Sequence, residues 1–177
     1  MLTHGRRLVE AVLADPRLRL VYRPHPRTGA SRADFETADH QIRALVRRGG
    51  GIVDTGPDPV ETFASADILV ADVSAIAHDW LPTRRPLVVT DVESPASVVA
   101  RTRLADVVPR LTVAQLPEVA ELIHHHATQD PVRDERVALE EYYFGDPALG
   151  TGTERFVAAC LEVIAERDAE LDAKGRR

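Results

Sequence analysis

The 177-residue chain contains one cysteine, few aromatic residues and no long apolar run, and each shortage excludes a class of protein. The single cysteine, Cys160, has no partner for an internal disulfide, so nothing in the sequence requires an oxidising compartment. No segment approaches the ~20 consecutive apolar residues of a membrane-spanning helix. The amino-terminal residues lack the apolar core of a signal peptide. We therefore expect a soluble, cytoplasmic protein.

Charge is unevenly distributed along the chain. The formal net charge is −6, yet residues 1–55 hold ten arginines and six acidic residues, which leaves the remainder strongly acidic. A basic first third in an acidic protein favours a local anion site. Aromatic residues make up only 5% of the chain, and a nucleic-acid-binding protein combines basic with stacking aromatic residues. We therefore expect no nucleic-acid partner.

Short apolar strands alternate with helices over the first two thirds of the chain, and the last third is helical. We expect helices at 6–14, about 34–48, 60–64, 75–81, 116–126, 133–143 and 153–169, and strands at 18–22, 52–53, 68–71, 87–90 and within 107–113. Asp34 is the expected N-cap of the second helix. This alternation predicts an α/β fold in which a Rossmann-like parallel sheet is flanked by helices.

The sequence predicts one domain over residues 1–170 and a frayed tail over 171–177. Because the first expected element is a helix, the strand that precedes it in a doubly wound domain is missing from the pattern. We expect the exposed apolar surface left by the missing strand to favour association.

The first candidate site is the segment 22–29, YRPHPRTG, which follows the expected strand 18–22. Open α/β sheets bind ligands at the carboxyl ends of their strands. The prolines on both sides of His25 hold it on a stiff, non-helical backbone. Arg23 and Arg27 can grip phosphate oxygens, and His25 can donate to a developing charge or move a proton. A proline-rich turn with a solvent-facing histidine is the structural alternative.

The second candidate site lies where the strand 68–71 ends. Asp72 and Ser74 follow this strand, and a helix opens at Ala75, whose first N–H groups can face an anion. The structural alternative is that Ser74 only caps this helix. Asp79, one turn later, and Asp91, after the strand 87–90, are weaker candidates that could equally pair with an arginine.

Other features carry no expected chemistry. Consecutive helical residues diverge by ~100°, so His124, His125 and His126 are not expected to hold one metal ion. Cys160 is expected in an apolar helical core rather than as a nucleophile. Gly49, Gly50 and Gly51 lack the spacing of a phosphate-binding loop and are expected to end a helix.

Taken together, the two candidate segments resemble the carboxyl-terminal domain of the CDP-glycerol glycerophosphotransferases, the teichoic-acid synthases of bacterial cell walls. The resemblance extends over about residues 6–165. The residues that match the family pattern are Arg23, His25, Pro26, Asp67, Asp72, Ser74 and Asp79. Val73 stands where the family has tyrosine, Ala75 where it has a second serine, and His78 where it has phenylalanine. The segment 142–156 is similar to the closing segment of the family, which implicates Gly152 and Arg155 in binding.

This resemblance implies the donor-binding half of a GT-B fold. The implied reaction transfers a glycerophosphate or similar phosphopolyol unit from CDP-glycerol to a hydroxyl of a wall polymer or lipid-linked acceptor, with release of CMP. His25 would be the catalytic group. The implied donor ligands are Arg23, Arg27, Thr28, Asp72, Ser74, Ala75, Asp79, Gly152 and Arg155. No metal or other cofactor is expected.

The resemblance also implies that an amino-terminal acceptor domain is missing from this chain, which would then have little activity alone. The full-length enzyme would work at the inner face of the cell membrane. Two other interpretations stay open. One is a GT-B sugar-nucleotide epimerase or glycosyltransferase domain, which would bind a UDP-sugar. The other is a non-catalytic domain whose helical last third is a docking surface.

Overall fold

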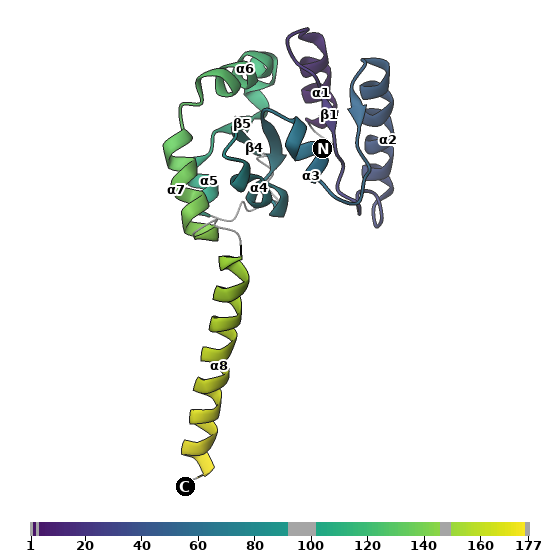
Figure 1. The fold of residues 1–177 in the computed structure, drawn as a ribbon. Coiled ribbons are helices and arrows are strands. Elements are labelled where there is room, and N and C mark those ends of the chain that lie inside the picture. Colours follow the sequence, from purple (N-terminus) through teal and green to yellow (C-terminus); the bar gives the residue numbers. More distant parts are fainter. Residues whose placement is uncertain (1, 3, 92–101, 146–149, 176–177) are drawn as a thin grey trace. The chain divides into compact units, whose positions relative to one another are not determined.

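The computed structural model describes residues 2, 4–91, 102–145 and 150–175 (Figure 1). The chain divides into two compact units, Met1–Val137 and Ala138–Arg177. Residues 92–101, which follow the strand that ends at Asp91, lie outside the described residues.

The described residues of the first unit form five short strands. They are β1 (Val21–Tyr22), β2 (Ile52–Val53), β3 (Leu69–Asp72), β4 (Leu87–Asp91) and β5 (Arg110–Thr112). Its helices are α1 (Gly5–Ala14), α2 (Ala33–Arg48), α3 (Val60–Ser65), α4 (Ala75–Trp80), α5 (Arg103–Val107) and α6 (Val119–Gln129), and two 3₁₀ helices cover Leu81–Thr83 and Val113–Glu118. The order of helices and strands follows the sequence prediction except for α5, which the sequence did not predict.

Every described strand pairing is parallel. β1 pairs with β2 in one sheet, and β3, β4 and β5 form a second sheet in that order. Asp72 lies opposite Thr90, and Asp91 lies opposite Thr112, so the carboxyl ends of these strands lie together. The predicted α/β class with a parallel sheet flanked by helices is confirmed.

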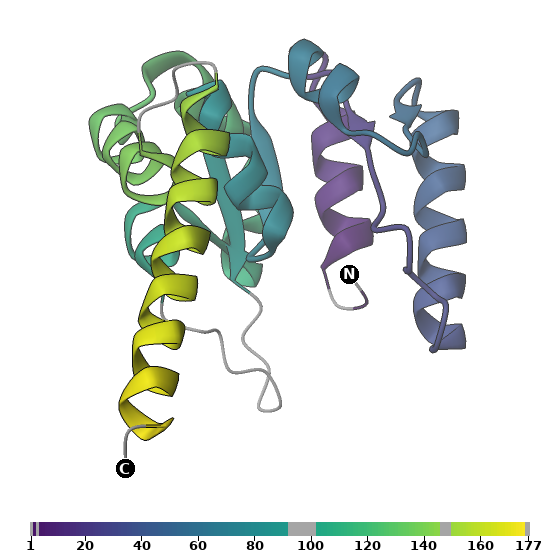
Figure 2. The same ribbon diagram turned by 60° about the horizontal axis from the view of Figure 1, so that its bottom comes forward.

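Helix α1 contributes to the apolar cores of both sheets. Val12 belongs to a buried cluster with Val88 of β4 and residues of β5 and α6. Val9, one turn earlier, belongs to a second cluster with Ile42 and Val46 of α2, against which Val53 of β2 packs. α1 and α2 run side by side in both ribbon views (Figures 1 and 2). Helix α1 therefore packs against residues of both sheets.

Several details differ from the sequence prediction. β1 comprises only Val21–Tyr22 of the expected 18–22. Asp34 is not an N-cap, because α2 begins at Ala33; its carboxylate accepts from the backbone N–H of Phe35 and from Arg32 instead. The expected stop at the glycine run is confirmed, since Gly49 caps α2 and Gly50 has a φ of +78°.

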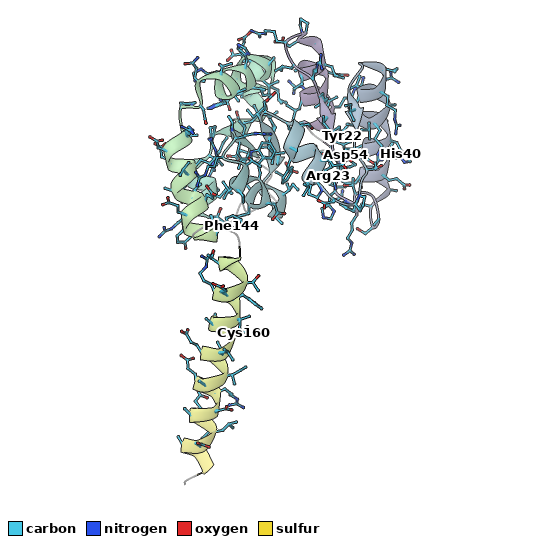
Figure 3. All side chains as sticks on the ribbon, viewed as in Figure 1. Tyr22, Arg23, His40, Asp54, Phe144 and Cys160 are labelled. Carbon is cyan, nitrogen blue, oxygen red and sulfur yellow. The ribbon has the colours of Figure 1, made fainter. Side chains whose placement is uncertain are left out.

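The helical last part of the chain is confirmed. α7 spans Arg133–Phe144 and crosses the boundary between the two units, and α8 spans Thr151–Gly175. Residues 171–175, expected in a frayed tail, are helical. Cys160, which Figure 3 labels on α8, is exposed, so the prediction of a core position for this cysteine is wrong. Within the described ranges, no helix is both long enough and apolar enough to span a membrane.

Candidate functional site

His25 lies on an exposed turn three residues beyond β1. The backbone N–H of Thr28 donates to the carbonyl of His25 at 2.8 Å, which closes the turn. The backbone N–H of Arg27 donates to Nδ1 of His25 at 3.1 Å. In the neutral imidazole the proton therefore lies on Nε2, which makes this nitrogen a hydrogen-bond donor.

Arg23 does not reach outward as a phosphate ligand would. Its guanidinium donates to the carboxylate of Asp54, which follows β2, and at 2.7 Å to the carbonyl of Gly56. The two side chains are only 17% and 18% exposed, and Figure 3 shows them beside each other. Arg23 therefore ties the loop after β1 to the loop after β2, and Arg27, which is exposed, is the arginine available to an anion on this turn.

Asp54 is a strongly held carboxylate. It accepts from the hydroxyl of Thr62 on α3, from the backbone N–H of Gly56 at 2.8 Å and from Arg23. These bonds, that from Thr62 first, lower the pKa of Asp54 from its ordinary 3.8 to about 2. Because each bond favours the ionised form, Asp54 carries its charge throughout the physiological range.

The second candidate segment lies at the carboxyl end of β3. The carboxylate of Asp72 accepts from the hydroxyl of Thr90 on β4, which fixes one of its oxygens. Ser74 occupies the N-cap position of α4 without a side-chain capping bond, because its hydroxyl donates to the carbonyl of Asp72 at 3.1 Å. Ser74, Ala75 and Asp79 are exposed. The alternative in which Ser74 caps the helix through its side chain is therefore not the arrangement seen.

The two segments follow different sheets: the His25 turn follows β1 of the two-stranded sheet, and Asp72 ends β3 of the three-stranded sheet. A shallow depression at the carboxyl ends of β4 and β5 is lined by other residues, His4 and Thr112 among them, and leaves no room for a water molecule. Gly152 and Arg155 belong to the second unit. There, Arg155 donates to the carbonyl of Phe144 at 2.8 Å.

Three charged or polar groups near these segments escaped the sequence prediction. Asp54 is one. Asp39 on α2 is buried, and it accepts from the hydroxyl of Tyr22 at 2.8 Å and from Arg43 at 2.6 Å. Burial raises the pKa of Tyr22. His4 is also buried, and burial is the main reason why its pKa lies below 6.5, while Asp72 acts in the opposite direction.

Asp39 could have been found in the sequence, because it stands four residues before Arg43 on the apolar face of the helix, the spacing of an ion pair. No local pattern marks Asp54, because its two side-chain partners come from the loop after β1 and from α3. Among the described residues, no group of three histidine, cysteine, aspartate or glutamate side chains is placed to hold a metal ion, and this includes the run His124–His126.

Comparisons of this chain with protein-family models, with curated proteins and with solved structures found no match. The candidate site is therefore defined by its own residues.

Proposed function

We propose that this chain binds the diphosphate of a CDP-activated polyol, as the donor half of an enzyme that transfers the phosphopolyol unit to a polymer hydroxyl. The observation that carries the proposal is the turn at His25, which exposes the ring and leaves Nε2 as its donor. A donor at this place can stabilise the negative charge that develops on the phosphoryl oxygens during transfer. The family resemblance of both segments supports the same reading.

We assign different roles to the two arginines of the first segment, because Arg23 is paired and Arg27 is exposed. Arg27 is exposed beside the His25 turn, and its guanidinium can contact the diphosphate directly. Arg23 is a positioning residue, because its ion pair with Asp54 fixes the start of the turn. We assign Ser74 and Asp72, at the carboxyl end of β3, to the same ligand, Ser74 through its exposed hydroxyl.

The proposal is tested by titrating the ¹⁵N-labelled chain with CDP and following its amide resonances. We expect weak binding, with a dissociation constant on the order of 1 mM, because one half of a GT-B cleft contacts only part of the donor. Shifts should concentrate in residues 25–29 and 72–76. UDP should give smaller shifts, and equal or larger shifts with UDP would favour the sugar-nucleotide alternative.

Two variants distinguish a specific role of the His25 ring in CDP binding from a general effect of removing a histidine. His25→Ala should weaken CDP binding about tenfold, which corresponds to the ~1.4 kcal/mol of one charge-assisted hydrogen bond. His40→Ala is the matched control, because His40 is exposed on α2 (Figure 3) and should leave binding unchanged. If CDP shifts no resonance in either segment, the proposed function is wrong.

A further inference from the structure

Helix α8 carries a stripe of exposed apolar side chains. Six large apolar side chains of this 25-residue helix are between 45% and 70% exposed, and none of the residues 152–174 is buried. Most of the stability of a helix in a protein comes from packing of its apolar face, and a helix without such packing is marginal in water. We therefore expect another surface to cover the stripe, which consists of Phe156, Val157, Leu161, Val163, Ile164 and Leu171.

The central part of the stripe is symmetric about Cys160, which is also exposed (Figure 3). Phe156 and Val157 stand four and three residues before this cysteine. Val163 and Ile164 stand three and four residues after it. Residues three and four apart lie on the same side of a helix, so the same apolar pattern is met in either direction from Cys160. A surface with this symmetry can contact a copy of itself that runs in the opposite direction.

The first unit carries no comparable stripe among its described residues. Its exposed large apolar side chains come from four separate segments, and no helix or strand contributes more than one of them. A second copy of α8 does carry a stripe of the same size, and a two-fold contact uses the same surface on both copies. The four side chains of the first unit are Leu2, Ile52, Val60 and Val113.

Charges on the same side of α8 favour an antiparallel contact. Arg167 and Lys174 stand seven and fourteen residues after Cys160, and residues seven apart lie on one side of a helix. Their exposed ion pairs with Glu170, at 3.7 and 3.9 Å, leave both charges on this side. In a parallel pair each cation would face its own copy, and like charges repel. In an antiparallel pair centred on Cys160, Arg167 faces the uncharged Thr153 of the second copy instead.

We propose that α8 is a dimerisation helix, covered by α8 of a second copy that runs antiparallel to it about a two-fold axis at Cys160. Val157 packs against Ile164 of the second copy, and Phe156 against Val163 of the second copy. With roughly 100 Å² from each exposed side chain, two copies bury about 1,000 Å² in total, the least that a specific interface needs. The inference does not depend on what the chain binds or catalyses.

The first test measures association of the full chain by sedimentation velocity at increasing concentration. For an interface of this size we expect a monomer–dimer equilibrium with a dissociation constant on the order of 10 μM. Ile164→Glu places a charge in the contact and should weaken association at least about tenfold. Ala169→Glu is the matched control, because Ala169 is exposed on the side of α8 opposite Cys160 and should leave association unchanged. A chain that stays monomeric, or equal effects of the two substitutions, would overturn the proposal.

The second test uses Cys160 as a probe of the two-fold axis. Packed helices lie about 8–10 Å apart, which leaves the Cα atoms of the two Cys160 residues roughly 5 Å from each other, a distance that a disulfide spans. Mild oxidation should therefore link most of the unmodified chain into dimers. The control variant Cys160→Ser/Ala169→Cys, with its cysteine on the opposite side of α8, should link far less. Equal linking of the two chains would contradict the proposed face.

The direction of the contact is read from two further variants, Val157→Cys and Ile164→Cys, each in a chain that also carries Cys160→Ser. The two chains are mixed and oxidised, and the linked products are identified by mass spectrometry. We expect the mixed disulfide between positions 157 and 164 to predominate, because these positions meet only in the antiparallel arrangement. Predominance of the disulfides between like positions would show a parallel pair and would overturn the proposed arrangement.

Discussion

At the scale of single residues, the two charged neighbours in the first candidate segment have separate tasks. Arg23 is held by Asp54 and Gly56 at the base of the turn, whereas Arg27 is exposed beside His25. Both arginines match the requirement for a phosphate ligand equally well in the sequence. Only the position of Asp54, thirty-one residues further on, shows that one of them is already paired.

The ion pair between Arg23 and Asp54 should contribute measurably to stability. Both side chains are largely buried and the aspartate accepts two further bonds, so we expect Arg23→Ala to cost about 1–2 kcal/mol. A double-mutant cycle with Asp54→Ala, measured by urea unfolding, should give a coupling energy of about 1 kcal/mol. Additive effects of the two substitutions would show that the pair contributes no interaction of its own. Arg6→Ala, which breaks an exposed pair with Glu10, is the control and should change stability by less than about 0.5 kcal/mol.

At the scale of helices and strands, the turn after β1 depends on one glycine. Gly29 has a φ of +86°, and a Cβ atom built there would lie 2.8 Å from Cβ and 2.9 Å from Cα of Glu36 on α2. Because two of the three nearest atoms belong to the backbone of Glu36, rotation of a side chain could not relieve the clash. The end of the His25 turn therefore packs closely against the beginning of α2 at Glu36.

We expect Gly29→Ala to destabilise the chain by about 3 kcal/mol, the sum of a left-handed backbone and a steric clash. Gly50→Ala is the matched control, because Gly50 has a φ of +78° with no atom within 4 Å of the added Cβ. It should cost only about 1 kcal/mol. Thermal unfolding by circular dichroism of the two variants measures the difference. Equal losses would show that the contact with Glu36 yields and does not fix the turn.

Helical periodicity and apolar runs were enough to place most of the elements, whereas α5, with five residues, is too short to show a periodic pattern and was not predicted. The pattern of Leu8, Val9 and Val12 gave α1, and the run 87–90 gave β4, because these signals are local. The lengths of the strands were harder to predict from the sequence. Leu18 and Leu20 are as apolar as Val21, and only the pairing with β2 decides where β1 begins. Propensity contains no information about that partner.

The candidate site was predictable in part for the same reason. The position of His25 after a strand is a local property, and its turn is closed by the neighbours Arg27 and Thr28. The bond between Thr90 and Asp72 and the one between Arg23 and Asp54 join separate strands. Such contacts follow from sheet order and register, which no single segment encodes.

At the scale of the whole molecule, stability should depend on pH in two separate ranges. His4 is buried and its pKa lies below 6.5, so the folded chain holds this proton less tightly than the unfolded chain. Its neutral form stabilises the fold in full above pH 6.5, and this stabilisation decreases as the pH falls below that value. His126, also partly desolvated, acts in the same direction. Asp54 contributes in full above pH 3.8, and its contribution is lost as the pH falls toward about 2.

Single substitutions should remove these two ranges independently. His4→Gln should reduce the slope of the free energy of unfolding between pH 7.5 and 5.5, measured with urea, and leave the acid range unchanged. Above pH 5, the free energy of unfolding of Asp54→Asn should lie below that of the unmodified chain by a constant amount. Below pH 4 this difference should become smaller. His40→Gln, at an exposed position, should alter neither range. A slope between pH 7.5 and 5.5 that survives His4→Gln unchanged would mean that the burial of His4 does not make the stability of the fold depend on pH.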